Sequence, residues 1–127
     1  MPFNPTYQIK VTARSIYIPD QSDPSACKYF FAYQITIQNT GDIAAQLLTR
    51  HWVITDSNEK IERVNGEGVV GEFPSLAPGE SFEYTSAAAI ETPVGTMEGH
   101  YKMRAEDGKE FEATIPQFSL SVPRTLH

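Results

Sequence analysis

The amino-acid sequence predicts an all-β protein, an antiparallel β-sandwich of about seven strands. Apolar and polar residues alternate in three long segments, and turn-forming Gly, Pro, Asn and Asp separate the segments. No segment is suited to a crossover helix of the kind that joins parallel strands. The chain has 127 residues, which is the size of one domain, so we expect a single domain over residues 1–127.

The first strand is expected from residue 7 to residue 18. Its apolar residues occupy odd positions up to residue 13 and even positions afterwards, at Ile16 and Ile18. Side chains change face when a strand slips by one residue, so this change predicts a β-bulge near Arg14 and Ser15.

The clearest strand is expected from Tyr29 to Asn39, and turn residues follow it. One of its faces carries the alternate apolar residues Tyr29, Phe31, Tyr33, Ile35 and Ile37. The other face is polar except at Phe30 and Ala32. Either neighbouring loops cover these two side chains, or they begin a contact patch for a partner.

Four shorter strands are expected at residues 46–55, 60–64, 81–88 and 96–105. Trp52 in the first of these is expected to fill the core between the two sheets. Residues 78–79 (Pro-Gly) and 107–108 (Asp-Gly) predict tight turns, because Pro fixes φ and Gly tolerates a positive φ. Residues 86–91 contain helix-favouring alanines, and Pro93 limits any helix there to about two turns.

The last strand is expected from residue 111 to residue 122. Its apolar residues move from odd to even positions at Pro116 and Gln117. Proline cannot donate a hydrogen bond to a neighbouring strand, so we expect one strand that is kinked by a bulge at Pro116.

Charge and composition exclude several classes of function. Ten basic and sixteen acidic residues give a net charge of −6, which argues against binding to nucleic-acid phosphates or to an anionic membrane. No apolar run reaches the roughly 20 residues that span a bilayer. Cys27 is the only cysteine, and Met1–Pro5 lacks the features of a signal peptide, so we expect a cytoplasmic protein.

Gly66, Gly68 and Gly71 match the G-x-G-x-x-G pattern of phosphate-binding loops. That function needs a helix N-terminus after the loop, and Pro74 disfavours a helix there. Two hypotheses therefore remain: the glycines serve loop geometry alone, or the backbone amides of residues 66–71 bind an anion such as a nucleotide or pyrophosphate.

The sequence predicts no catalytic group, no metal site and no cofactor. His51, His100 and His127 lack the spacing of metal-ligand motifs, and the acidic residues are scattered over the strands. Cys27 is not in a sequence context that would activate a nucleophile. Two long loops, residues 20–26 and 66–78, leave two alternatives: they recognise a protein partner, or they serve structural packing alone.

Five blocks of sequence carry a family resemblance. They are Phe31–Tyr33, Gln46–Asp56, Val64–Gly71, Pro78–Ser86 and Glu91–Tyr101. With these blocks the chain resembles the bacterial ApaG proteins over nearly its whole length. The first few residues and residues 20–26 are the parts that vary.

The resemblance implies a fibronectin type III-like, and hence immunoglobulin-like, β-sandwich without enzymatic activity. It also implies a loose association with cobalt tolerance and magnesium efflux. Related domains in eukaryotic proteins act as interaction modules. We therefore expect a non-catalytic module that binds a protein partner, with small-ligand binding at Gly66–Gly71 as the alternative, and a chain that is a monomer or a weak homodimer.

Overall fold

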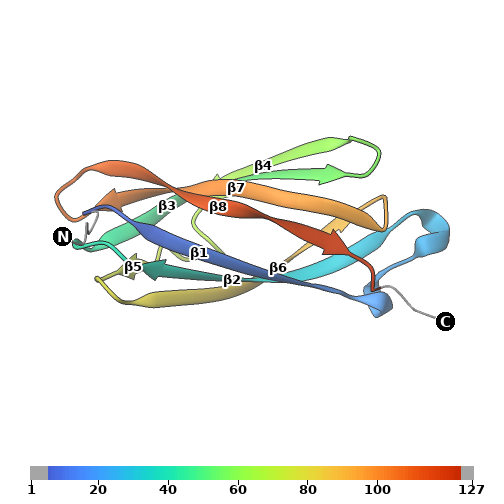
Figure 1. Cartoon of the computed structure of the whole chain (residues 1–127), viewed down its shortest axis with the longest axis horizontal. Coiled ribbons are helices and arrows are strands. Elements are labelled where there is room, and N and C mark those ends of the chain that lie inside the picture. The colour runs from blue at the N-terminus through green and yellow to red at the C-terminus, as the bar shows by residue number, and fades with distance from the viewer. Residues whose placement is uncertain (1–5, 124–127) are drawn as a thin grey trace, which may run out of the picture.

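The computed structural model describes residues 6–123, which form two antiparallel sheets packed face to face (Figure 1). The first sheet has the order β1 (Ile9–Tyr17), β2 (Tyr29–Asn39), β6 (Ser81–Ile90). The second has the order β4 (Ile61–Glu67), β3 (Ala45–Asp56), β7 (Val94–Ala105), β8 (Glu110–Ser121), and β5 (Ser75–Leu76) pairs with the start of β3. Two short 3₁₀ turns, η1 (Pro19–Gln21) and η2 (Pro24–Ala26), connect β1 to β2. The predicted β-sandwich is confirmed, with the two-residue β5 as an additional strand.

The predicted β-bulge in β1 is wrong. β1 pairs with β2 without interruption from Ile9 opposite Asn39 to Tyr17 opposite Phe31. Ser15 therefore lies on the inner side, where its hydroxyl donates to the Ser119 carbonyl of β8 at 2.6 Å. Ile16 lies on the outer face and is 64% exposed. The apolar pattern misled because a hydrogen bond between the sheets satisfies Ser15 at an inward position.

Residues 86–91 form no helix: the strand expected at residues 81–88 is confirmed, and β6 continues two residues further, to Ile90. Ala87 lies opposite Ala32 and Ala89 lies opposite Phe30 in the ladder with β2. Alanine has the highest helix propensity of the residues, but intrinsic propensity is a weak preference that pairing with a central strand outweighs.

The predicted kink in β8 is confirmed. Met97 lies opposite Phe118 and Gly99 lies opposite Ile115, so the register shifts between these two pairs. Pro116 and the residue after it thus face a single residue of β7, which is the geometry of a β-bulge.

The predicted tight turns are confirmed as well. The Glu80 amide donates to the Ala77 carbonyl at 2.9 Å, and Gly79 between them has φ 88°. In the β7–β8 hairpin the Gly108 amide donates to the Ala105 carbonyl at 2.8 Å, with φ 91° at the glycine.

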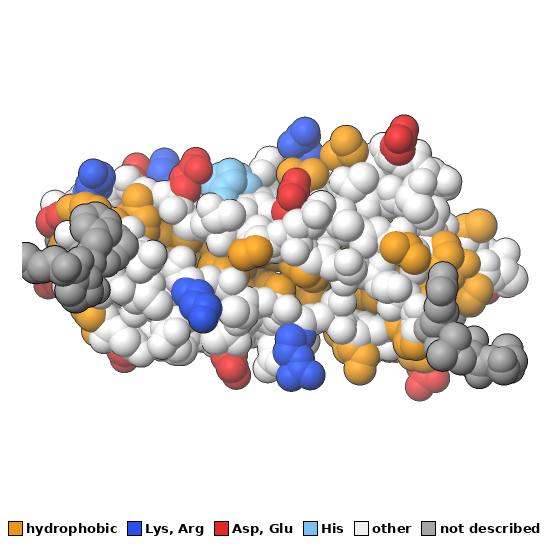
Figure 2. All heavy atoms as spheres, in the orientation of Figure 1, with side chains coloured by type: hydrophobic (Ala, Val, Ile, Leu, Met, Phe, Trp, Pro, Cys, Tyr) orange, Lys and Arg blue, Asp and Glu red, His pale blue; other side chains and the backbone are white. Residues whose placement is uncertain are grey.

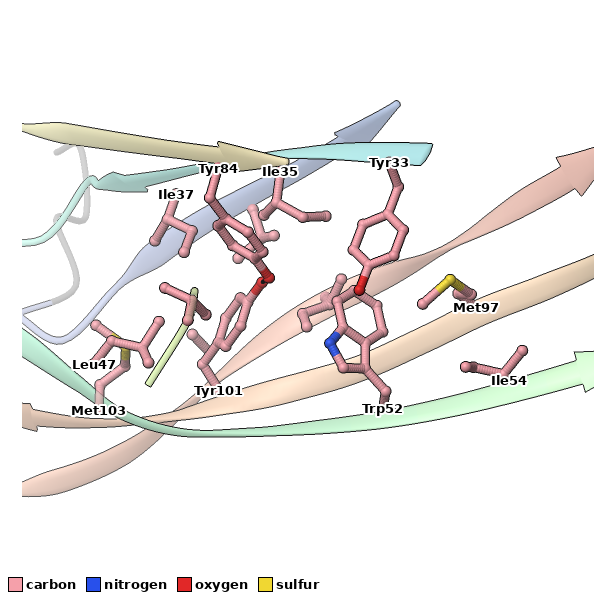
Figure 3. Close-up of a cluster of buried hydrophobic side chains, with 14 of the residues drawn as sticks. Tyr33, Ile35, Ile37, Leu47, Trp52, Ile54, Tyr84, Met97, Tyr101 and Met103 are labelled. Carbon is pink, nitrogen blue, oxygen red and sulfur yellow. Dashed lines mark hydrogen bonds between the residues drawn. The ribbon is translucent and has the colours of Figure 1, made fainter. Parts of the chain in front are cut away.

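The core contains the inner faces of both sheets, and Trp52 lies near its centre (Figure 3). Trp52 is 3% exposed and makes edge-on contact with Tyr33, at 5.4 Å between ring centroids. Tyr101 and Phe118 contact the same indole at 6.5 and 6.0 Å. The predicted position of Trp52 is confirmed.

The two long sides of the sandwich differ. On one side β1 packs along β8, and these two strands run beside each other in Figure 1. On the other side β6 pairs only with β2, and β4 pairs only with β3. The sandwich is therefore closed on the β1–β8 side and open on the β4–β6 side.

Candidate functional site

A groove between β4 and β6 opens on this second side. It has a volume of about 380 Å³. We call it the edge groove, and define it by the lining residues Arg50, Trp52, Val64, Ser86 and Ala88. Ladder pairs build its floor, with Arg50 opposite Gly66, Trp52 opposite Val64 and Ile54 opposite Glu62.

Arg50 lies on the inner side of β3, on the same face as Trp52. Its Nη1 donates to the carbonyl oxygens of Glu67 and Gly68, each at 2.9 Å. A Cβ at Gly66 would lie 2.6 Å from the guanidinium carbon, so a larger residue there would displace the end of the Arg50 side chain from this position. We did not single out Arg50 from the sequence, although its even position in line with Trp52 was a usable signal.

The Arg50 guanidinium brings a positive charge into the edge groove. Within residues 6–123 no Asp or Glu forms an ion pair with it. Glu62 lines the same groove from β4. Beyond Glu62, the Lys60 ammonium pairs with the Glu91 carboxylate at 3.0 Å, which links the residue before β4 to the residue after β6.

Two tyrosines meet beside Arg50 in the core. The Tyr84 and Tyr101 hydroxyls, one from each sheet, approach to 2.5 Å and point toward each other in Figure 3. Burial raises the pKa of Tyr84 to about 12, and burial also raises the pKa of Tyr101 far above its ordinary value. Both hydroxyls are therefore neutral at ordinary pH, and the pair joins the two sheets.

The free edge of β6 forms the upper margin of the edge groove. In residues 6–123, the backbone of Phe82–Ile90 makes hydrogen bonds only to β2. Residues 85–89 are Thr-Ser-Ala-Ala-Ala, so this part of the edge carries small, uncharged side chains. The register with β2 contains no bulge. Lysine, proline and bulges are the usual protections of an edge strand, and this stretch has none of them.

An apolar row crosses the outer face of the first sheet to the same edge. Ile16, Ala32 and Ala87 lie side by side in register, and Phe30 lies beside Ala89. Phe30 and Ala32 are half-buried, while Ala87 and Ala89 are exposed. The apolar pair noted in the sequence thus belongs to a larger surface that reaches β6. On the side seen in Figure 2, basic and acidic side chains are interspersed instead of forming one charged patch.

The glycine loop forms a tight turn. Val69 and Glu72 exchange two backbone hydrogen bonds of 2.9 Å, and between them Val70 has φ 45° and Gly71 has φ 79°. Two positive φ values in succession define a type I′ turn. A Cβ at Gly68 would lie 2.4 Å from the Glu72 carbonyl oxygen.

Gly66, Gly68 and Gly71 each have a structural role, but their phosphate-binding function stays a prediction. The Gly68 amide donates to the Leu48 carbonyl and the Val69 amide donates to the Glu72 carbonyl. Strand β5, and not a helix, follows the turn. Anion binding would therefore depend on the remaining amides of the loop.

The fold brings two histidines together that the sequence left separate. His51 and His100 are opposite each other on β3 and β7, and their rings stack at 4.6 Å. Both ring nitrogens of His51 lie within hydrogen-bond distance of neighbours, Asn65 at 2.8 Å and Thr49 at 2.9 Å. No group of three or more His, Cys, Asp or Glu that suits a metal ion occurs in residues 6–123. His127 lies outside the described residues.

Two further sequence features are placed as follows. The Cys27 thiol is free and exposed, after η2, in left-handed backbone with φ 54°. The described part of the chain contains no helix that is long and apolar enough to cross a membrane.

Comparison with known proteins gives consistent relatives. The model of the ApaG domain matches residues 19–105. Protein ApaG of Thiobacillus denitrificans is 59% identical over 121 residues, which cover 95% of each chain. Protein ApaG of Ralstonia nicotianae is 58% identical and covers 95% of this chain and 98% of its own. A crystal structure from Bordetella pertussis, described as an ApaA protein, has a TM-score of 0.92 and 50% identity, and covers 98% of this chain and all of its own.

Proposed function

The chain belongs to the ApaG family, and from this premise we propose that it is a non-catalytic module that binds another protein through the open side of its sandwich. The relatives carry the name of the family and no name of a catalytic activity. The free edge of β6 is the observation that carries the proposal. Its unpaired backbone groups and small side chains offer a surface to which another chain can hydrogen-bond.

The apolar row Ile16–Ala32–Ala87 supports the same surface, because it extends the edge onto the outer face of the sheet. Contiguous exposed apolar residues on a monomer commonly mark a site of contact with a partner. The association of the family with cobalt tolerance and magnesium efflux then acts through the bound partner.

Site-specific cross-linking in cells tests this proposal. A photoreactive amino acid at Ala87 is expected to give discrete cross-linked products, because Ala87 is exposed at the edge of β6. The same amino acid at Thr114, exposed on β8 away from this edge, is the control and is expected to give none. Products at both positions, or at neither, would contradict the proposal.

An edge substitution extends the test to the cellular role. Ala87→Lys places a charged side chain on the edge and is expected to block strand pairing without unfolding the protein. Cells with this variant should resemble deletion mutants in cobalt sensitivity, while cells with Thr114→Lys should resemble the wild type. Thermal unfolding of both purified variants checks that each is folded.

A further inference from the structure

The partner surface contains a feature that selects among extended segments. Arg50 projects into the edge groove below β6, and the described residues supply no carboxylate to it. Its two hydrogen bonds to Glu67 and Gly68 use one nitrogen of the guanidinium, Nη1. A guanidinium that uses only one nitrogen in this way is suited to bind a carboxylate, with which it forms strong charge-assisted hydrogen bonds.

The groove has a defined polarity along β6. Arg50 lies opposite Tyr101 in the ladder, and Tyr101 contacts Tyr84, so Arg50 marks the Tyr84 end of β6. The Lys60–Glu91 ion pair marks the other end. Moving along the floor from that end, the groove presents the acidic Glu62, then the apolar Trp52 and Val64, and then the basic Arg50.

The spacing of these groups matches an extended chain. Arg50, Trp52 and Ile54 are alternate residues of one strand, so their side chains are about 7 Å apart, as are alternate side chains of any strand. A strand added to β6 would therefore place successive inward side chains over Glu62, over Trp52 with Val64, and over Arg50.

We propose, building on the proposed function, that the edge groove binds an extended segment of another protein that pairs antiparallel with β6 and carries the pattern basic–x–apolar–x–acidic. The acidic side chain binds the Arg50 guanidinium, the apolar side chain covers Trp52 and Val64, and the basic side chain lies at Glu62. Antiparallel pairing sets this order from the N-terminus to the C-terminus, because β6 runs from the Arg50 end toward the Glu62 end.

A second copy of this chain fits the groove less well. When the β6 strands of two copies pair antiparallel, the inner faces of the two sheets lie on the same side. The partner copy would therefore place its own inward residues, Tyr84, Ser86 and Ala88, over the groove. None of these carries a carboxylate, and Arg50 would stay without a counter-ion. Charge complementarity therefore favours an acidic side chain from a different protein.

A pair of synthetic peptides tests the pattern. The probe is a fluorescent heptapeptide, Thr-Lys-Thr-Val-Thr-Glu-Thr, and the comparison peptide has its Lys and Glu exchanged. By fluorescence anisotropy, the probe should bind at least about tenfold more tightly than the exchanged peptide. Equal affinities, or no binding of the probe at about 1 mM, would overturn the proposal.

Protein variants locate the binding. Arg50→Gln keeps a donor for the Glu67 and Gly68 carbonyls and removes the charge, so it should lower the affinity for the probe peptide about tenfold. Arg63→Gln is the matched control on the outer face of β4 and should change affinity by less than about twofold. If both variants bind the probe like the wild type, Arg50 does not receive the acidic side chain and the proposal fails.

N-methylated probes test strand addition without changing the protein. Methylation of the alternate amides that point to β6 should abolish binding, while methylation of the other set should leave it intact. Equal effects of the two sets would exclude pairing with β6. Sedimentation of the protein alone completes the test, because a dimer that Ala87→Lys dissociates would show that the occupant is a second copy.

These outcomes separate the two proposals. If cross-links form at Ala87 but Arg50→Gln does not change the affinity for the peptide, the proposed sequence pattern is wrong. The proposal of an interaction module is then still supported. Absence of cross-links at Ala87 would overturn the proposed function itself.

Discussion

Gly66 and Arg50 show how one residue determines the place of another. The missing Cβ of Gly66 leaves the space that the Arg50 guanidinium occupies, and the guanidinium in turn binds the carbonyls of the next two residues. The first glycine of the G-x-G-x-x-G pattern therefore has a packing role that needs no phosphate.

Trp52→Ala is expected to destabilise the protein by about 3–5 kcal/mol, since it removes the aromatic side chain that joins Tyr33, Tyr101 and Phe118. Urea unfolding measures this loss. A melting temperature within a degree or two of the wild type would contradict the placement of Trp52 at the centre of the core.

Val70→Asn is expected to stabilise the protein by about 1 kcal/mol. Val70 is β-branched and exposed, and it holds φ 45° at the first central position of the type I′ turn. Asn tolerates this backbone conformation, and Asn-Gly is the preferred pair for such a turn. Differential scanning calorimetry should show a higher melting temperature, and a decrease would mean that the Val70 side chain contributes more than its backbone costs.

Single elements depend on their neighbours in the sheets. β6 is a strand although its alanines favour a helix, because β2 pairs with it along its whole length. β1 has no bulge although its apolar residues move from odd to even positions, because the Ser119 carbonyl of β8 accepts a hydrogen bond from the inward Ser15 hydroxyl. In both elements a contact between segments far apart in the sequence decided the conformation.

The glycine loop gives a prediction at the scale of one element. Gly68 and Val69 donate their amides within the protein, and a strand instead of a helix N-terminus follows the turn. We therefore expect no shift in the NMR signals of amides 66–71 on addition of millimolar pyrophosphate or ATP. Saturable shifts confined to these amides would instead establish the anion-binding hypothesis for Gly66, Gly68 and Gly71.

At the scale of the whole molecule, the Tyr84–Tyr101 pair connects the two sheets. It also makes the stability of the fold decrease with rising pH in the alkaline range. The pKa of Tyr84 is raised from 10.0 to about 12 in the folded protein. Between these values the unfolded chain loses its proton first, so stability is full below about pH 10 and falls as the pH rises toward 12. Urea unfolding at a series of pH values measures this decline.

The Tyr84→Phe, Tyr101→Phe double variant is the control for this pH dependence. It removes both raised groups, so its stability should fall less steeply between pH 10 and pH 12. An unchanged slope would show that other groups, and not this pair, are responsible.

The sequence by itself determined the β-sandwich, the bounds of β2, the kink at Pro116, the turns and the buried position of Trp52. These features follow from alternation and turn chemistry, which act over a few neighbouring residues. The family was also recognisable from contiguous blocks of sequence.

Only the tertiary structure decided the inner position of Ser15, the extension of β6 beyond Ala88 to Ile90, the stacking of His51 on His100 and the edge groove around Arg50. Each depends on which strands become neighbours and on which edge stays unpaired. Sheet order arises from contacts across the whole chain, so no local pattern specifies that β6 and β4 are left with open edges and that Arg50 lies between them.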